Sequence, residues 1–282
     1  MTPSETITSP SNPRIKQAAS LRDADARRAS GLTLVDGRRE LARAAAAGIP
    51  IVEAFIDERR LHDTRSDAPE QLGDWAERLG AAGTRIAFVS ERAFDRVAFG
   101  TRNEGIVGVV RFRPMPLAAV TFPADRPVLL IEGVEKPGNL GAILRTVDAA
   151  GLGGVIICDG RTDVANPAVI RASLGTVFAV RLGTASTTDV IDWCRQQGRR
   201  VVAATPEGSR MWHESNLLGS VAILLGSEAH GVSESWQAAA AAGTLALETI
   251  RLPMRGIADS LNLSVTTAIL AYESVRQEST TP

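Results

Sequence analysis

Short, uninterrupted runs of Val, Ile and Leu recur through the second half of the chain, and a segment of helical length follows each of them. Strands that read as continuous apolar runs are typical of a parallel sheet buried on both faces. The helical segments supply the crossovers that parallel strands need. The pattern therefore predicts an α/β fold with helices on both faces of a parallel sheet. Strands are expected at residues 128–133, 154–160, 177–182, 199–205, 221–227 and 247–253, and helices at 139–150, 166–175, 187–197, 233–242 and 260–277.

The first part of the chain shows the same alternation on a smaller scale and predicts a small α/β domain over residues 1–112. Its first helix has Asn12 as the expected N-cap and Pro13 at the first helical position. The proline-rich residues 113–126 are expected to be a stiff, extended linker, because proline disfavours helix interiors and central strands. Residues 127–282 would then form the second domain.

Composition excludes several classes of protein. Apolar residues make up 44% of the chain and charged residues 22%, as in ordinary globular proteins. No apolar stretch approaches the roughly 18 residues of a membrane span, and the N-terminus has no apolar signal-peptide core. Cys158 and Cys194 show no metal-ligand spacing. We therefore expect a cytoplasmic protein with two buried, reduced thiols, no membrane segment and no metal.

The balance of charge says little about partners, because the net charge is −1. Arginine accounts for 29 of the 31 basic residues, which suits bidentate contacts to phosphate. A biased genomic base composition explains the same abundance. Charge alone therefore neither requires nor excludes a nucleic-acid partner.

The stretch PGNLGAILRT, residues 137–146, follows a predicted strand and opens a helix. Leu140, Ile143, Leu144 and Val147 recur at helical spacing and form one apolar stripe. Arg145 points about 150° from the centre of that stripe, away from the core. Asn139 can cap the helix. The stretch is not a G-x-G-x-x-G fingerprint, so a nicotinamide oxidoreductase is disfavoured.

Two further stretches place glycines and polar residues directly after predicted strands. In AILLGSEAHGVS, residues 222–233, Gly226, Glu228 and Gly231 follow an apolar run; either a ligand approaches the backbone there, or this is a plain turn before a helix capped by Ser233. In the stretch of residues 250–264, a strand ends at Pro253 and a helix opens with SLNLS. Polar groups that meet at the carboxyl ends of strands mark the usual ligand site of an α/β sheet.

Together these three stretches resemble the signature motifs of the SpoU/TrmH family of SPOUT RNA methyltransferases. Asn139 and Arg145 match the family's N-x(5)-R motif, and Gly226, Glu228 and Gly231 match its Gly-x-Glu-x-x-Gly motif. The run from Ile250 through Pro253 and Met254 to Ser260–Ser264 is similar to the third motif, with Leu252 where isoleucine is common. NPRIK, TLVDGRREL and RNEGIVGVV in the first part also resemble the family, as does VIRASLGTVFAVRL in the second.

The resemblance implies a C-terminal SPOUT domain with a deep trefoil knot, S-adenosylmethionine as the cofactor, and an obligate homodimer with the site near its interface. Topology rules alone would have favoured an open sheet. The resemblance also implies that the N-terminal domain binds the RNA substrate. The residues expected to hold the cofactor are Thr205, Leu225, Gly226, Leu252, Met254 and Leu261.

The resemblance assigns activation of a ribose 2′-hydroxyl to Arg145, with Asn139, Glu228, Ser260 and Asn262 in positioning roles. A guanidinium keeps its proton at physiological pH and is a poor general base. A second role therefore stays open, in which Arg145 clamps the neighbouring phosphate and polarises the hydroxyl.

The function expected from the sequence is transfer of a methyl group to a ribose 2′-hydroxyl of RNA. The N-terminal domain favours ribosomal RNA, since tRNA-specific relatives usually lack it. A tRNA methyltransferase and a non-catalytic RNA-binding paralogue are the alternatives. The intact set of motif residues argues against the paralogue.

Overall fold

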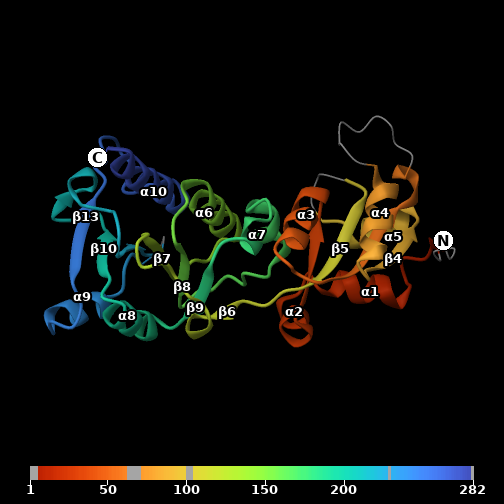
Figure 1. Cartoon of the computed structure of the whole chain (residues 1–282), viewed down its shortest axis with the longest axis horizontal. Helices are drawn as coiled ribbons and strands as arrows, with labels where there is room; N and C mark the ends of the chain where they lie inside the picture. The colour runs from red at the N-terminus through yellow and green to blue at the C-terminus, as the bar shows by residue number, and fades with distance from the viewer. Residues whose placement is uncertain (1–5, 62–70, 100–103, 228–229, 281–282) are drawn as a thin grey trace. The chain divides into compact units, whose positions relative to one another are not determined.

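The structure is a computed structural model that describes residues 6–61, 71–99, 104–227 and 230–280. The chain forms two compact units (Figure 1). Unit 1 consists of Met1–Arg113 together with Val164–Ala179, and unit 2 consists of Pro114–Asp163 together with Val180–Pro282. The chain therefore leaves unit 2 once, contributes a short segment to unit 1, and returns.

Unit 1 is a five-stranded sheet with helices packed on it, in the strand order β1-β4-β3-β5-β2. All neighbouring strands are parallel except at β5, which runs antiparallel to both β3 and β2. Its elements are β1 (Thr6–Ile7), α1 (Pro13–Ser20), α2 (Ala24–Ser30), β2 (Leu32–Asp36), α3 (Arg38–Ala46), β3 (Ile51–Asp57), the 3-10 helix η1 (Glu58–Arg60), α4 (Leu72–Ala81), β4 (Arg85–Val89), α5 (Glu91–Val97), β5 (Ile106–Arg111), α7 (Pro167–Ala172) and the 3-10 helix η3 (Thr176–Phe178).

The core of unit 1 lies between the sheet and the helices α1 and α5. Ile15 of α1, Phe94 of α5 and Phe55 of β3 are fully buried in it. On the other face, Gly108 of β5 allows close packing of α3, because a Cβ there would lie 2.4 Å from Leu41 Cδ2. Asn12 accepts a hydrogen bond from the Arg14 amide and precedes Pro13, so the predicted start of the first helix is confirmed.

The segment Val164–Ala179 belongs to unit 1 through specific contacts. The Thr33 hydroxyl donates to the Ala165 carbonyl at 2.6 Å, and Arg43 Nη1 donates to the Leu174 carbonyl at 2.7 Å. The rings of Phe112 and Phe178 meet edge to face at 5.0 Å. The sequence had assigned this segment to the second domain, so its place in unit 1 differs from the predicted boundaries.

Unit 2 is an eight-stranded sheet in the order β11-β13-β10-β12-β7-β8-β9-β6, and every pair of neighbours is parallel. Its elements are β6 (Met115–Pro116), the 3-10 helix η2 (Leu117–Ala119), β7 (Val128–Glu132), α6 (Pro137–Ala150), β8 (Gly154–Cys158), β9 (Leu182–Ala185), α8 (Thr187–Gln196), β10 (Arg200–Ala204), β11 (Arg210–Met211), the 3-10 helix η4 (Trp212–Glu214), β12 (Val221–Leu225), α9 (Glu234–Ala241), β13 (Leu247–Arg251) and α10 (Leu263–Thr280).

Helices cover both faces of this sheet, with α6 and α10 on one side and α8 and α9 on the other (Figure 1). Successive side chains of β7 alternate between the two faces: Val128 and Leu130 pack with the cluster that contains Trp236 of α9. All five residues of β7, of β8 and of β12 are buried. The predicted α/β fold with a parallel sheet between two helical layers is confirmed.

Three local predictions were wrong. Residues 177–182 were predicted as a strand, but Thr176–Phe178 form a 3-10 helix in unit 1 and the strand β9 begins only at Leu182. Helix α6 begins at Pro137, so Asn139 lies inside its first turn and Lys136 is the N-cap residue. Helix α10 begins at Leu263, so Ser260 lies before it instead of capping it.

The proline-rich residues after Arg113 also differ from the extended linker expected. Met115 and Pro116 form β6, which pairs with β9 at the edge of the sheet. Leu117 and Phe122 are buried in the core of unit 2. Proline is compatible with an edge strand, because its missing N–H faces away from the ladder. The apolar residues between the prolines account for the packing.

Candidate active site

The loops that follow β10 and β13 meet at the carboxyl edge of the sheet of unit 2. The Thr205 amide donates to the Ile250 carbonyl at 2.9 Å, and Arg251 Nη1 donates to the Gly208 carbonyl at 2.6 Å. A Cβ on Gly208 would lie 2.1 Å from the Ile250 carbonyl carbon, so only glycine fits there. The two loops therefore share one site, although about 45 residues separate them in the sequence.

The loop after β12 is closed by a pair of backbone hydrogen bonds. The Ser227 amide donates to the Gly231 carbonyl at 2.9 Å, and the Gly231 amide donates back at 3.0 Å. A Cβ on Gly226 would lie 2.0 Å from the Gly231 carbonyl carbon. Gly226 is thus required for the two ends of the loop to close. Glu228, which the sequence placed in this motif, lies outside the described residues.

The loop after β7 lies beside the loop after β12. Gly133 has a φ of +64°, which favours glycine, and a Cβ there would lie 3.2 Å from Ser227 Cβ. The carboxyl ends of β7 and β12, which are neighbouring strands, therefore place the loop that leads into the first motif stretch beside the second stretch.

The first and third motifs meet through two asparagines. Asn262 Nδ2 donates to Asn139 Oδ1 at 3.1 Å. Asn262 Oδ1 accepts from the Ser264 amide at 2.9 Å and from the Ser264 hydroxyl at 2.7 Å. Asn262 thus caps α10, the role expected of Ser260, and holds Asn139 at the start of α6. Ser260 is exposed in the preceding segment.

Arg145 lies on the exposed side of α6, while Leu140, Ile143, Leu144 and Val147 of the same helix are buried. The predicted orientation of Arg145 is confirmed. Within the described residues its side chain makes no hydrogen bond or ion pair. Six helical residues place Arg145 about 9 Å along the axis from Asn139 and about 120° around it. The structure thus brings Asn139 and Asn262 together and leaves Arg145 apart from them.

The sequence did not single out Glu132, the buried last residue of β7. Its Oε1 accepts from the Thr187 hydroxyl at 2.9 Å, and its Oε2 accepts from the Ser233 amide at 2.9 Å and from Trp236 Nε1 at 3.2 Å. These donors belong to the starts of α8 and α9, so the carboxylate fixes both helices behind the loop after β12. The sequence feature that could have identified Glu132 is its position as an acidic residue at the end of an apolar run.

The expected cofactor residues lie along the same edge. Leu225 is buried, Thr205, Gly226, Leu252 and Met254 are half-buried, and Leu261 is 38% exposed. Their side chains are apolar or uncharged. Such a set suits an adenosyl group and a thioether carbon chain, with the backbone of the loops as the source of polar contacts. The residues present therefore fit S-adenosylmethionine.

Both cysteines are free and buried, as predicted. Burial raises the pKa of the Cys158 thiol well above its usual range and that of Cys194 to about 12. Both thiols stay protonated, so neither is a nucleophile. Across the described ranges, no three His, Cys, Asp or Glu side chains gather as metal ligands. In the same part of the chain no helix is both long and apolar enough to span a membrane.

Comparison with known proteins assigns both units to families. Residues 126–272 match the SpoU rRNA Methylase family, which is more than half of the chain. The chain belongs to the SpoU rRNA methylase family. Residues 12–108 match the MRM3-like substrate binding domain. The predicted family is confirmed.

The similarity of this SpoU protein to named relatives covers most of its length. A 23S rRNA (guanosine-2′-O-)-methyltransferase of Bordetella pertussis is 31% identical over 78% of this chain and 89% of its own. A 23S rRNA (uridine(2479)-2′-O)-methyltransferase of Streptomyces viridochromogenes is 29% identical over 94% of this chain and 90% of its own.

Solved structures are similar over nearly the whole chain. The crystal structure of an RNA 2′-O ribose methyltransferase is 36% identical, with a TM-score of 0.81, and covers 97% of this chain and 99% of its own. The AdoMet-bound rRNA methyltransferase of Sinorhizobium meliloti is 27% identical, with a TM-score of 0.82, and the match covers 97% of this chain and 98% of its own.

Proposed function

We propose that this protein transfers a methyl group from S-adenosylmethionine to the 2′-hydroxyl of a ribose in ribosomal RNA, most consistently 23S RNA. The observation that carries the proposal is the meeting of the loops after β7, β10, β12 and β13 at one edge of the sheet in unit 2. The relatives named as 23S rRNA 2′-O-methyltransferases match this chain over about nine-tenths of their own length, which supports the same reaction here.

In this proposal the cofactor is held by uncharged residues at the end of β12 and on the loops after β10, β12 and β13: Thr205, Leu225, Gly226, Leu252, Met254 and Leu261. S-adenosylmethionine supplies an electrophilic methyl group on a sulfonium. The backbone of the closed loop at Gly226 gives the adenosyl part a rigid, neutral contact surface. That rigidity reduces the entropy lost on binding.

Arg145 acts on the RNA. Its guanidinium is exposed and unpaired within the described residues, so it is available to a ribose hydroxyl and the neighbouring phosphate. It retains its proton, polarises the hydroxyl and stabilises negative charge as the oxygen attacks. Asn139 and Asn262 fix the start of α6 through their mutual hydrogen bond. Glu228 and Ser260 complete the positioning groups.

A second copy of the chain forms the functional homodimer, with the site near its interface. Val265, Ile269 and Tyr272 recur at helical spacing along α10, and Val265 and Tyr272 are 47% and 53% exposed. Leu261 and Ile257, just before α10, are exposed as well. An apolar stripe of this kind supports burial against another molecule. The C-terminal methyltransferase domain carries the deep trefoil knot in this proposal.

Unit 1 binds the RNA substrate, and residues 127–282 contain the methyltransferase domain. The match of residues 12–108 to a substrate-binding domain supports the first role. A cytoplasmic location and catalysis without a metal are part of the same proposal.

Two measurements test the proposal together. Isothermal titration of the full-length protein with S-adenosylmethionine should show binding. Absence of binding at millimolar cofactor would refute the proposed enzymatic function. Mass-spectrometric mapping of 2′-O-methyl groups, in rRNA and tRNA from strains with and without the protein, should show one or more missing methyl groups in 23S RNA. A loss confined to tRNA would instead support the tRNA alternative.

A further inference from the structure

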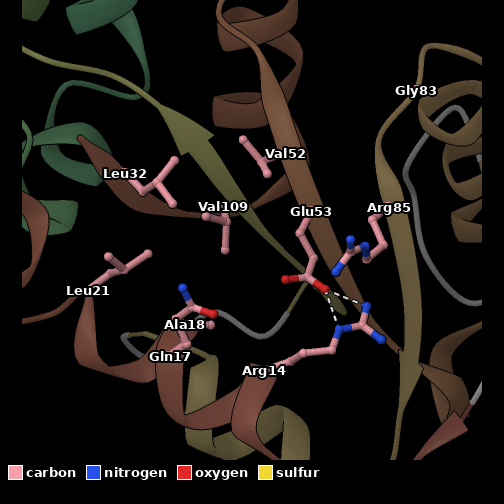
Figure 2. A pocket seen from close by; sticks show the side chains of 10 residues that line it. All are labelled: Arg14, Gln17, Ala18, Leu21, Leu32, Val52, Glu53, Gly83, Arg85 and Val109. Carbon is pink, nitrogen blue, oxygen red and sulfur yellow. Dashed lines mark hydrogen bonds and ion pairs between the residues drawn. The ribbon is translucent and has the colours of Figure 1, made fainter. Parts of the chain in front are cut away.

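Unit 1 contains a cavity of about 350 Å³ between α1 and the sheet, lined by residues of unit 1 (Figure 2). Its apolar walls come from α1 and from the strands β2, β3 and β5. The apolar wall residues are Ala18, Leu21, Leu32, Val52 and Val109. Its size falls at the lower end of the range of small-ligand sites, large enough for a nucleobase with part of its ribose.

A β-bulge in β3 shapes one wall. The pairing of β3 with β5 shifts register between Ile51 and Glu53, which makes Val52 the extra residue. In a regular strand, consecutive side chains point to opposite faces. Here Val52 and Glu53 both line the cavity. The bulge thus adds an apolar surface beside a carboxylate, the usual effect of a bulge that redirects a side chain.

Glu53 presents a fixed carboxylate to the cavity. Arg14 Nε donates to Glu53 Oε1 at 2.6 Å, and Arg14 Nη2 makes an ion pair with the same oxygen. The Glu53 side chain is only 15% exposed. The other carboxylate oxygen points into the cavity (Figure 2). Arg14 therefore orients the carboxylate while one oxygen stays available to a ligand.

Two further polar side chains line the same cavity. Arg85 of β4 lies directly opposite Glu53 in the sheet, and Gln17 of α1 lies on the opposite wall (Figure 2). Within the described ranges neither side chain makes a hydrogen bond. Arg111 is exposed two residues beyond Val109 on β5, hence on the same face of the sheet. Positive charge therefore flanks the cavity on two strands.

We infer that this cavity receives an unpaired guanine base of the RNA substrate, with Glu53 reading its Watson–Crick edge and Arg85 contacting a flanking phosphate. The inference rests on the proposed function, because that function supplies the RNA. Sequence-specific RNA recognition commonly takes single-stranded bases out of the stack and reads their edges.

The carboxylate selects guanine by hydrogen-bond chemistry. Guanine places two adjacent N–H donors on its Watson–Crick edge, whereas a carboxylate only accepts. Adenine and cytosine place a ring-nitrogen acceptor beside their amino donor, and uracil places carbonyl oxygens on both sides of its single donor. Those acceptors would face Glu53 unfavourably. The Gln17 amide can donate to the O6 of guanine, and the aliphatic walls cover the ring.

The test uses the full-length protein and short RNA hairpins that carry one bulged nucleotide. The bulge is guanosine, inosine, adenosine, cytidine or uridine, and affinity is measured by fluorescence anisotropy. The guanosine hairpin should bind about tenfold more tightly than the adenosine, cytidine and uridine hairpins. Inosine, which lacks the 2-amino donor, should be intermediate. Equal affinity for all five hairpins would overturn the inference.

Variants locate the preference in the cavity. Glu53→Gln should bring the guanosine preference to within about twofold of the other bases, and the exposed control Glu77→Gln should keep the full preference. Val52→Phe fills the cavity from a position that is 38% exposed and should remove the preference without disturbing the Arg14 pair. Its control is Ala45→Phe on the exposed side of α3. A preference that survives both cavity variants would place the recognition elsewhere.

Arg85→Ala should weaken all the hairpins by a similar factor and reduce the salt dependence, as expected for a phosphate contact. Free GMP, added as a competitor, distinguishes the source of the base. Competition only at millimolar GMP supports recognition within RNA. Competition at low micromolar GMP would make the cavity a free-nucleotide site and overturn the inference.

Cofactor binding and methyl transfer to 23S RNA are measured on the same preparations, so that two failures can be separated. Methyl transfer with no guanosine preference would refute the cavity inference alone. A guanosine preference without S-adenosylmethionine binding would refute the proposed function alone. When both hold, Glu53→Gln should raise the KM for rRNA at least about fivefold while the affinity for S-adenosylmethionine is unchanged.

Discussion

The two units differ at the carboxyl ends of their parallel strands. We call this edge open in unit 2, where it leads into loops with partly exposed residues, and closed in unit 1, where buried carboxylates are bonded to neighbouring groups. In unit 2 the strands β10, β12 and β13 lead into loops with half-buried residues such as Thr205, Gly226 and Leu252. In unit 1 the strands β2 and β3 end at Asp36 and Asp57, and both carboxylates are buried and bound to neighbours.

The two buried carboxylates at that edge of unit 1 are bonded within the unit. Arg59 donates to Asp57 Oδ1 at 3.1 Å and to Oδ2 at 2.8 Å, and the Phe99 amide donates to Asp36 Oδ2 at 2.5 Å. The cavity of unit 1 instead lies where β3 and β4 begin, beside Glu53 and Arg85. The candidate site of unit 2 thus lies at the carboxyl ends of its strands, the usual address of a ligand in an α/β sheet, whereas the cavity of unit 1 lies at the amino ends of β3 and β4.

The largest expected effect concerns the open edge of unit 2. Arg145→Ala should reduce methyl transfer at least about a thousandfold, because the variant loses the charge that stabilises the attacking oxygen. The affinity for S-adenosylmethionine should stay within about twofold, since no cofactor residue touches Arg145 in this proposal. Single-turnover transfer and isothermal titration measure the two quantities.

The control for this variant is Arg195→Ala, which removes an exposed arginine of α8 that pairs with Asp192. It should leave methyl transfer within about twofold of the wild type. An Arg145→Ala enzyme that retains a tenth of wild-type activity would show that the guanidinium is not the group acting on the hydroxyl.

Glu132 is the exception in unit 2, since it closes β7 as Asp57 closes β3. Glu132→Ala would leave the Thr187 hydroxyl, the Ser233 amide and the Trp236 ring N–H buried without an acceptor. The free energy of unfolding should fall by about 4 kcal/mol. Urea unfolding followed by tryptophan fluorescence measures it.

The matched control is Glu135→Ala, three residues further along. Glu135 pairs with Arg161, and both side chains are about half exposed or more. Exposed pairs contribute little, so this variant should lose less than about 1 kcal/mol. Equal losses from both variants would mean that the buried carboxylate has no special structural role.

The sequence predicted the layers of unit 2 well, because continuous apolar runs require burial on both faces wherever they occur. It also placed Arg145 correctly, since helical periodicity determines which side chains leave the core. The strand predicted at residues 177–182 was wrong because an apolar run requires burial but does not specify the surface that buries it. Val177 and Phe178 are apolar and typical of a strand, but the surface that buries them belongs to unit 1.

Contacts between distant residues could not be predicted from patterns. The Arg14–Glu53 pair joins residues 39 positions apart, and the bulge at Val52 depends on how β5 pairs with β3. Likewise, the place of Val164–Ala179 in unit 1 means that a deletion of residues 1–112 would uncover Val169 and Ile170. Point variants in the full chain therefore test unit 1 more cleanly than a truncation does.

The closed edge of unit 1 has a pH dependence of its own. Burial raises the pKa of the Asp36 carboxyl from its ordinary 3.8 to about 6, and the hydrogen bond from the Phe99 amide and the charge of Arg171 offset this only in part. The folded chain then binds a proton more tightly than the unfolded chain. The contribution of Asp36 to the free energy of unfolding should therefore be greatest below about pH 4. It should fall by up to about 3 kcal/mol as the pH rises through about 6.

Asp36→Asn should remove that dependence. Urea midpoints of the variant and the wild type, measured between pH 4 and 8, should diverge as the pH rises to 6 and run parallel above 7. The exposed control Asp25→Asn should follow the wild type throughout. Parallel curves for Asp36→Asn across the whole range would mean that Asp36 is charged at every pH and is stabilised by Arg171 instead.

The smallest expected effect tests whether the open edge of unit 2 depends on the closure of one loop. A Cβ at Gly226 would collide with the backbone of Gly231, so Gly226→Ala must separate the two ends joined by the Ser227–Gly231 hydrogen bonds. The affinity for S-adenosylmethionine should fall about tenfold, because the contact surface loses its fixed shape. Gly73→Ala, in a helix of unit 1 with nothing within 4 Å, should leave that affinity unchanged. An unchanged affinity in Gly226→Ala would mean that the cofactor binds to the loops after β10 and β13 alone. The loop after β12 would then belong to the open edge without being part of the cofactor site.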